Sequence, residues 1–125
     1  MLLLGVTAAI EALTGIALLA SPLLVGRLLL GTALEAPGVA LGRLCGVALL
    51  SFAALCLTVG GSGSSGPSVQ VIMAVFQAVI AACLAFIFFS AGLAGDLLWP
   101  AVIFHAGAAL LLIWRLDSLR PGWGR

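Results

Sequence analysis

The sequence predicts an all-α membrane protein: a four-transmembrane-helix bundle with a short interfacial helix between the first two spans. Two observations predict this fold class. Of the 125 residues, 64% are hydrophobic and 7% are charged, whereas soluble domains average roughly 45–50% apolar and about 25% charged residues. The apolar residues also fall into four runs of about 20 residues, the length that crosses roughly 30 Å of hydrocarbon as a helix.

The same composition excludes several classes of protein. A soluble domain of this size has too little interior to bury so much apolar side chain. A disordered chain would carry far more charge, and a formal net charge of +1 offers no basic surface to nucleic acid. We therefore expect one domain, residues 1–125, with the lipid bilayer as its main partner and no nucleic-acid partner.

The first predicted span covers residues 2–20 and ends at Ser21-Pro22. It has no basic leader and carries Glu11 in its middle, which favours a retained helix over a cleaved signal peptide. Residues 23–30 are too few to cross the membrane and are apolar apart from Arg27, so we expect an interfacial helix there. The alternative is that the first span continues past a kink at Pro22.

The other predicted spans cover residues 39–59, 69–91 and 97–116. Between the second and third, residues 60–66 read Gly-Gly-Ser-Gly-Ser-Ser-Gly, the composition of a flexible linker. This segment is either an engineered replacement of a native loop or a natural loop of a glycine-rich chain. In both cases it contributes nothing to a functional argument.

The arginines predict the orientation of the spans, because positive charges near a membrane prefer the cytoplasm. Arg27 and Arg43 lie on one side, and Arg115, Arg120 and Arg125 lie on the other. This majority predicts that both termini are cytoplasmic. The tryptophans fall at or beyond the ends of the fourth span, as expected for indoles at an interface: Trp99, Trp114 and Trp123.

One strongly polar side chain lies near the centre of each of three spans: Glu11 in the first, Gln77 in the third and His105 in the fourth. Such groups are costly in lipid and usually face the bundle interior, where each can find a partner in another. This shared depth predicts a polar cluster that binds a proton, an ion or a small amphipathic ligand. A purely structural network and pairing across an oligomer interface are the alternatives.

Arg43 is a further candidate for this cluster. If the second helix starts at Gly38, Arg43 lies roughly 7 Å and Glu11 roughly 13 Å from the same membrane surface at the helical rise. The long arginine side chain covers much of that difference. A Glu11–Arg43 ion pair would be a structural clamp.

The second span also carries a packing motif, in which Gly38, Gly42 and Gly46 form GxxxGxxxG. Small residues four apart let two helix backbones approach closely. The motif therefore predicts a tight helix crossing, either within the bundle or between protomers.

No sequence motif carries catalytic chemistry, since the chain has no Walker loop and no HExxH pattern. One histidine and scattered thiols give poor support for a metal site. We expect no catalytic residue, no metal and no cofactor; a redox enzyme using the thiols ranks last. The cysteines stand in apolar runs and are expected to be small buried hydrophobes: Cys45, Cys56 and Cys83.

Some short pieces carry a resemblance to known proteins. Gly42-Arg43 in the second span, with Leu98-Trp99-Pro100 and Phe104-His105 in the fourth, resemble small four-helix integral membrane proteins of GC-rich bacteria. This resemblance implies a bacterial inner membrane and no function. Glu11 is similar to the membrane glutamate of small multidrug resistance transporters, which couples proton and cationic-drug binding in a dimer. The chain has no Tyr for that family's aromatic cage, so this is an analogy only.

The sequence therefore predicts a small non-enzymatic membrane protein that binds a proton, ion or small amphipathic ligand, with transport as one use of that binding. The alternative is an accessory or assembly subunit whose buried polar residues are structural. A homo-oligomer or a larger membrane complex is compatible with both.

Overall fold

The computed structural model describes residues 2–61 and 67–118, which are helical apart from short connections. The helices are α1 (Leu2–Ala20), α2 (Pro22–Leu30), α3 (Ala36–Gly61), α4 (Pro67–Ala91) and α5 (Leu98–Ser118). All except α2 are long and apolar enough to cross a membrane. The predicted all-α fold, with four spans and a short helix between the first two, is confirmed. Most of the Gly/Ser segment, residues 62–66, lies outside the described residues, as do Arg120, Trp123 and Arg125.

The boundary between α1 and α2 decides between the two interpretations of residues 21–30. Ser21 leaves the helical conformation, with φ −147° and ψ 71°, and Pro22 then opens a new helix. Proline suits the first turn of a helix because its missing N–H would have no partner there. Gly31 ends α2 in the left-handed conformation, with φ 71°. The short helix is therefore separate and is not a kinked continuation of the first span.

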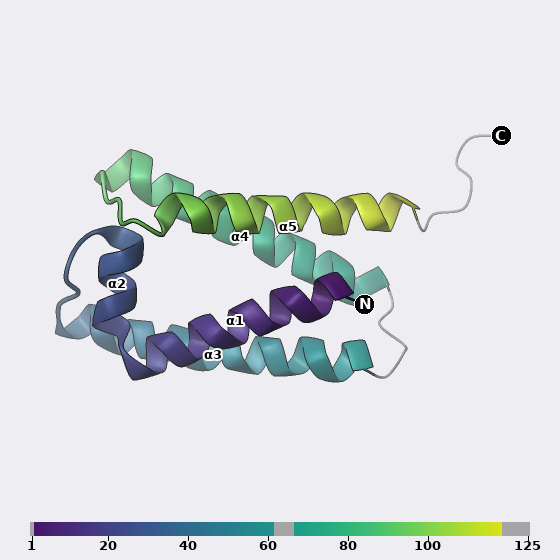
Figure 1. Ribbon diagram of the computed structural model, residues 1–125, viewed down its shortest axis with the longest axis horizontal. Coiled ribbons are helices and arrows are strands. Elements are labelled where there is room, and N and C mark those ends of the chain that lie inside the picture. Colours follow the sequence, from purple (N-terminus) through teal and green to yellow (C-terminus); the bar gives the residue numbers. More distant parts are fainter. Residues whose placement is uncertain (1, 62–66, 119–125) are drawn as a thin grey trace.

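The four long helices form two pairs, as Figure 1 shows. Helix α1 packs mainly against α3, and α4 packs mainly against α5. The short α2 contacts α1, α3 and α5, so it joins the two pairs at one end of the bundle. The start of α1 and the end of α5 lie together at the opposite end (Figure 1).

The α1–α3 contact is a direct approach of two backbones. A Cβ atom added to Gly15 would lie 2.8 Å from the carbonyl oxygen of Gly46, and one added to Gly46 would lie 2.8 Å from that of Gly15. Real side chains do not tolerate such distances, so the crossing depends on a glycine in each helix. Close approach at small residues is how helices gain packing contacts in lipid.

A small apolar core lies between the two pairs at the end remote from α2. Each of the four spans contributes to it, and its members are mostly small: Leu4, Ala8, Ala53, Cys56, Met73, Ala74 and Leu112. Beside it the rings of Phe52 and Phe76 lie 4.5 Å apart, centroid to centroid. Cys56 is buried as expected, but Cys45 and Cys83 are exposed, so the expectation of burial is wrong for those two thiols. They lie on outward helix faces, where a small apolar group needs no partner.

At the other end of the bundle, the α4–α5 connection docks on the end of α2. The N–H of Gly95 donates to the carbonyl of Leu29 at 3.0 Å, and the N–H of Leu97 donates to that of Leu28 at 2.8 Å. The last carbonyls of a helix have no partner within it. The connection therefore supplies the donors that the end of α2 lacks and fixes α2 against the second helix pair.

Candidate functional site

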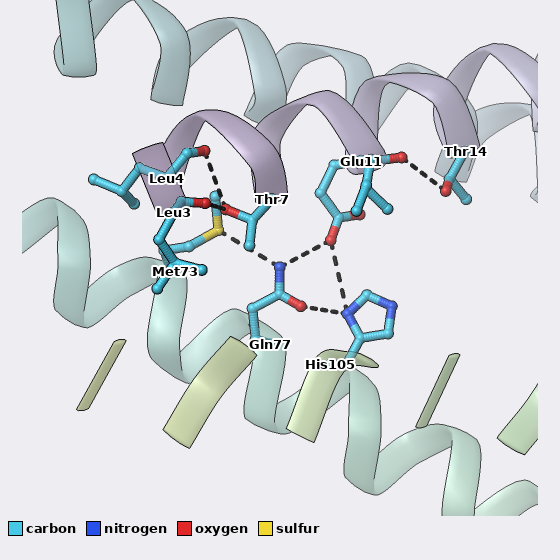
Figure 2. Close-up of polar contacts among 9 residues, drawn as sticks. Leu3, Leu4, Thr7, Glu11, Thr14, Met73, Gln77 and His105 are labelled. Carbon is cyan, nitrogen blue, oxygen red and sulfur yellow. Dashed lines mark hydrogen bonds and ion pairs between the residues drawn. The ribbon is translucent and has the colours of Figure 1, made fainter. Parts of the chain in front are cut away.

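The structure brings together the three polar side chains that the sequence places at one depth. Glu11 comes from α1, Gln77 from α4 and His105 from α5 (Figure 2). The Gln77 Nε2 group donates to Glu11 Oε1 at 3.0 Å, and Gln77 Oε1 is hydrogen-bonded to His105 Nδ1. We call these residues the polar triad. The Gln77–Glu11 bond joins the two helix pairs, whereas the Gln77–His105 bond lies within the α4–α5 pair.

The polar triad is almost closed to its surroundings. The exposed fraction is 2% for Glu11 and 0% for Gln77, and the His105 side chain is 13% exposed. His105 Nδ1 lies 3.8 Å from Glu11 Oε1, close enough for an ion pair when the ring is protonated. Gln77 Nε2 also lies 3.8 Å from Met73 Sδ. The triad is thus a compact polar contact inside an apolar bundle.

The central amide sets the direction of the hydrogen bonds. Because the NH₂ group of Gln77 faces the Glu11 carboxylate, its carbonyl oxygen faces His105. A carbonyl only accepts hydrogen bonds, so His105 Nδ1 carries a hydrogen and donates it. The other ring nitrogen, Nε2, lies on the side of the ring away from Gln77 (Figure 2). Nε2 is then the ring atom that gains or loses a proton.

The inward face of α1 presents Glu11 to its partners. The buried residues of this helix recur at helical spacing: Leu4, Thr7, Ala8, Glu11 and Gly15. The Thr7 hydroxyl donates within α1, at 3.1 Å to the carbonyl of Leu4. Thr14 likewise donates to Ile10 at 2.9 Å. Since these hydroxyls are satisfied by their own helix, the carboxylate is the α1 group that reaches across to α4.

Arg43 lies apart from the polar triad. Its side chain is exposed on α3, and the expected Glu11–Arg43 ion pair is absent from the described part of the chain. The physical reason is rotation about the helix axis. A Cβ on Gly42 would contact Pro22 and Leu18, so Gly42 faces the first two helices. The next residue is turned by about 100°, which points Arg43 away from Glu11. A role for Arg43 in binding stays a prediction.

The three glycines of α3 have different surroundings. Gly46 meets Gly15 of α1, and a Cβ on Gly42 would lie 3.1 Å from the Pro22 side chain of α2. A Cβ on Gly38 would lie 3.3 Å from Leu34, in the connection that precedes α3. The closest helix approach is therefore made at Gly46, inside a single chain.

Two hollows of the described surface lie away from the polar triad. One of about 240 Å³ lies between the start of α1 and the end of α5, and one of about 220 Å³ lies beside α2. Among residues 2–61 and 67–118, no three His, Cys, Asp or Glu side chains gather as a metal site would require. The members of the triad are bonded to one another, and none of them lines either of these two hollows.

The chain was compared with protein-family models, curated proteins and solved structures, and no match was found in any of the three. The fold and the site alone therefore define its class. It is a small polytopic membrane protein with a buried polar cluster of Glu11, Gln77 and His105.

Sequence reasoning placed the members of the triad but missed two features. It assigned no packing partner to Gly46, whereas Gly15 of α1 is that partner. It also used Trp114 only to mark the end of the last span, although Trp114 and Arg115 line a hollow against α1. The adjacent Trp-Arg pair at a span end was the available signal for the second feature.

Proposed function

We propose that this membrane protein binds an exchangeable proton at the polar triad. The observation that carries the proposal is the amide bridge, in which Gln77 is bonded to a carboxyl group on one side and an imidazole on the other. Because burial and neighbouring charges shift the pKa values of carboxyl and imidazole groups, both can take up a proton in the physiological pH range. Two such groups at 3.8 Å titrate as a unit and not independently.

Charge balance supports a bound proton. With Glu11 ionised and His105 neutral, the triad carries one negative charge, and the exposed Arg43 does not offset it. One added proton makes the triad neutral overall, either as a carboxylic acid beside a neutral ring or as a carboxylate beside an imidazolium. An uncompensated charge inside a bilayer is costly. The triad is thus built to hold one proton at either of two positions.

The packing favours a proton over the other two occupants that the sequence allows. An amphipathic ligand needs open access to the polar groups, whereas Glu11 is 2% and Gln77 0% exposed. A calcium or magnesium ion needs about six or more oxygen ligands, whereas the side chains of the triad offer only the Glu11 carboxylate and the Gln77 amide oxygen, which is bonded to His105. A proton needs no space. Proton-coupled transport would extend this proposal. It would require the triad to open towards each membrane surface in turn.

An accessory or assembly subunit is the second candidate, and a specific observation favours it. The Gln77–Glu11 hydrogen bond joins the two helix pairs and the Gln77–His105 bond joins α4 to α5, so the triad ties three spans together as a structural contact would. In that case the triad would hold the pairs together and keep one protonation state. The two functions therefore differ in whether the triad titrates in the folded protein.

The single histidine of the chain makes the test direct. The ring nitrogens of His105 are followed by ¹⁵N NMR across the pH range in which the purified protein stays folded, and the Glu11 carboxyl is followed by infrared spectroscopy. We expect both signals to change over the same pH interval. Glu11→Gln, which preserves shape and removes the charge, should change the His105 titration curve. Glu35→Gln is the matched control, because Glu35 is exposed at the α2–α3 connection.

The outcomes separate the two candidates. A His105 curve that Glu11→Gln alters and Glu35→Gln leaves unchanged supports proton binding at the triad. Constant His105 and Glu11 signals over the whole range, together with lower thermal stability in the Glu11→Gln variant, would overturn proton binding and support the structural role.

A further inference from the structure

The hollow between the start of α1 and the end of α5 has the chemistry of a lipid site, separate from the polar triad. It has a volume of about 240 Å³ and is lined by Leu2, Leu3, Val6, Leu111, Trp114 and Arg115. We propose that it binds one anionic phospholipid. The apolar side chains take a segment of an acyl chain, and the Arg115 guanidinium takes the phosphate.

The position of the hollow fits a lipid headgroup. Arg115 lies roughly 26 Å along α5 from Leu98 at the helical rise, close to the full thickness of the hydrocarbon layer. The start of α1 lies beside the same end of α5 (Figure 1). Trp114 is 68% exposed there, in keeping with the preference of indoles for the headgroup level. Arg115 therefore stands at the level expected for phosphates, and Leu111, one turn earlier on α5, lies about 6 Å deeper at the helical rise.

The charge of the lining favours an anion. Arg115 is the one charged residue among the six, and the lining includes no carboxylate. Arg115 already takes part in an interaction within the chain, but a guanidinium has five N–H donors, which leaves capacity for a phosphate. A basic pocket between transmembrane helices is a recognised kind of headgroup site.

The size of the hollow limits what it can hold. Pockets for drug-sized ligands begin at roughly 300 Å³, so 240 Å³ accommodates a segment of an acyl chain and not a whole drug-sized ligand. The hollow is also open along the outside of the bundle, where the neighbouring side chains Leu2, Val6 and Leu111 are exposed. A lipid fits both conditions, because the rest of it stays in the bilayer.

Trp114 is a built-in reporter for this site. The full chain with Trp99→Phe and Trp123→Phe keeps Trp114 as its single tryptophan. It is reconstituted in phosphatidylcholine vesicles that contain a small, equal fraction of either brominated phosphatidylglycerol or brominated phosphatidylcholine. Bromine quenches the fluorescence of a nearby indole, so the ratio of quenching by the two lipids measures the selectivity of the hollow for phosphatidylglycerol over phosphatidylcholine. We expect severalfold stronger quenching by the phosphatidylglycerol.

Two variants and one competitor test whether Arg115 causes the selective quenching of Trp114. Arg115→Gln should lower phosphatidylglycerol quenching to the phosphatidylcholine level. Arg43→Gln, which removes an exposed arginine that lines neither described hollow, should leave it unchanged. Inorganic phosphate in excess should not relieve the quenching, since it offers no acyl chain. If the double tryptophan variant does not fold, the two arginine variants are compared in the otherwise unchanged protein.

Selective quenching that depends on Arg115 and resists inorganic phosphate supports the lipid site. Equal quenching by the two brominated lipids overturns it, as does an equal effect of Arg43→Gln and Arg115→Gln. Relief by inorganic phosphate would show a site for free anions and would also overturn the lipid assignment.

Discussion

The contact between α1 and α3 and the seam between the two helix pairs are built in opposite ways. At Gly15 and Gly46 the two backbones touch, with no side chain between them. At the seam, α1, α4 and α5 each contribute one polar side chain to the triad. Beside it, Phe52 of α3 packs against Phe76 of α4. The first contact is fixed by the shape of two backbones, whereas the second is made by polar and aromatic side chains.

This difference separates the contact that fixes the geometry of one helix pair from the contact that carries the polar triad. Packing of backbone against backbone has one geometry, because any added atom collides. If the triad exchanges a proton as proposed, that change acts at the seam between the helix pairs and not at the backbone contact within the first pair.

The largest expected effect comes from filling the backbone contact. In Gly46→Ala the new methyl would lie 2.8 Å from the Gly15 carbonyl, and we expect a loss of about 1–3 kcal/mol from overpacking. The control is Gly107→Ala in α5, where nothing lies within 4 Å of the added atom. There the better helix propensity of alanine should make the change neutral or stabilising by up to ~1 kcal/mol.

Unfolding of the two variants in detergent, followed by circular dichroism, measures the difference. Equal stability of Gly46→Ala and Gly107→Ala would mean that α1 and α3 do not meet at these glycines, and the contrast between a rigid contact and a polar seam would fail.

A smaller loss is expected when the bridge of the triad is removed. Gln77→Leu keeps an apolar group of similar size but leaves Glu11 and His105 without their shared partner. We expect about 1–2 kcal/mol, since a buried polar group without its partner costs about 1–3 kcal/mol and side-chain hydrogen bonds in membranes contribute at most about 1.7 kcal/mol.

Gln70 provides a matched control on the same helix. Its Oε1 atom is buried without a hydrogen-bond partner, so Gln70→Leu should be neutral or stabilising in the same unfolding assay. If Gln70→Leu were as destabilising as Gln77→Leu, the energy would come from the apolar surroundings of α4 and not from the triad.

The smallest effect is expected at Arg43. Its side chain is exposed and apart from both contacts, so Arg43→Gln should change the free energy of unfolding by less than about 0.5 kcal/mol. A loss as large as that of Gln77→Leu would place Arg43 at the seam after all and revive the clamp to Glu11.

The sequence predicts depth in the membrane well and rotation about helix axes poorly. The lengths of the apolar runs were enough to place the four spans, because a span must cover the hydrocarbon. At Pro22 the sequence left open a kinked continuation of the first span, and the backbone at Ser21 decides for a separate helix. The centres of the first, third and fourth spans likewise placed Glu11, Gln77 and His105 at one level, and these three are in contact.

The lengths and centres of the apolar runs do not predict which helices are neighbours or which faces they share. Arg43 has a suitable depth, but it stands one residue after Gly42 and so faces another direction. The motif at Gly42 and Gly46 predicted a close crossing without naming its partner, which is Gly15. Neighbours are set by packing of whole faces, and single residues in one span do not specify the opposite face.

The joint between α2 and the α4–α5 connection has a consequence for biosynthesis. The carbonyls of Leu28 and Leu29 receive their hydrogen bonds from the N–H groups of Leu97 and Gly95, which leave the ribosome nearly seventy residues later. The end of α2 therefore lacks these two donors until the chain has been made as far as Leu97. Main-chain hydrogen bonds, which depend on no particular side chain, then join α2 to the α4–α5 connection.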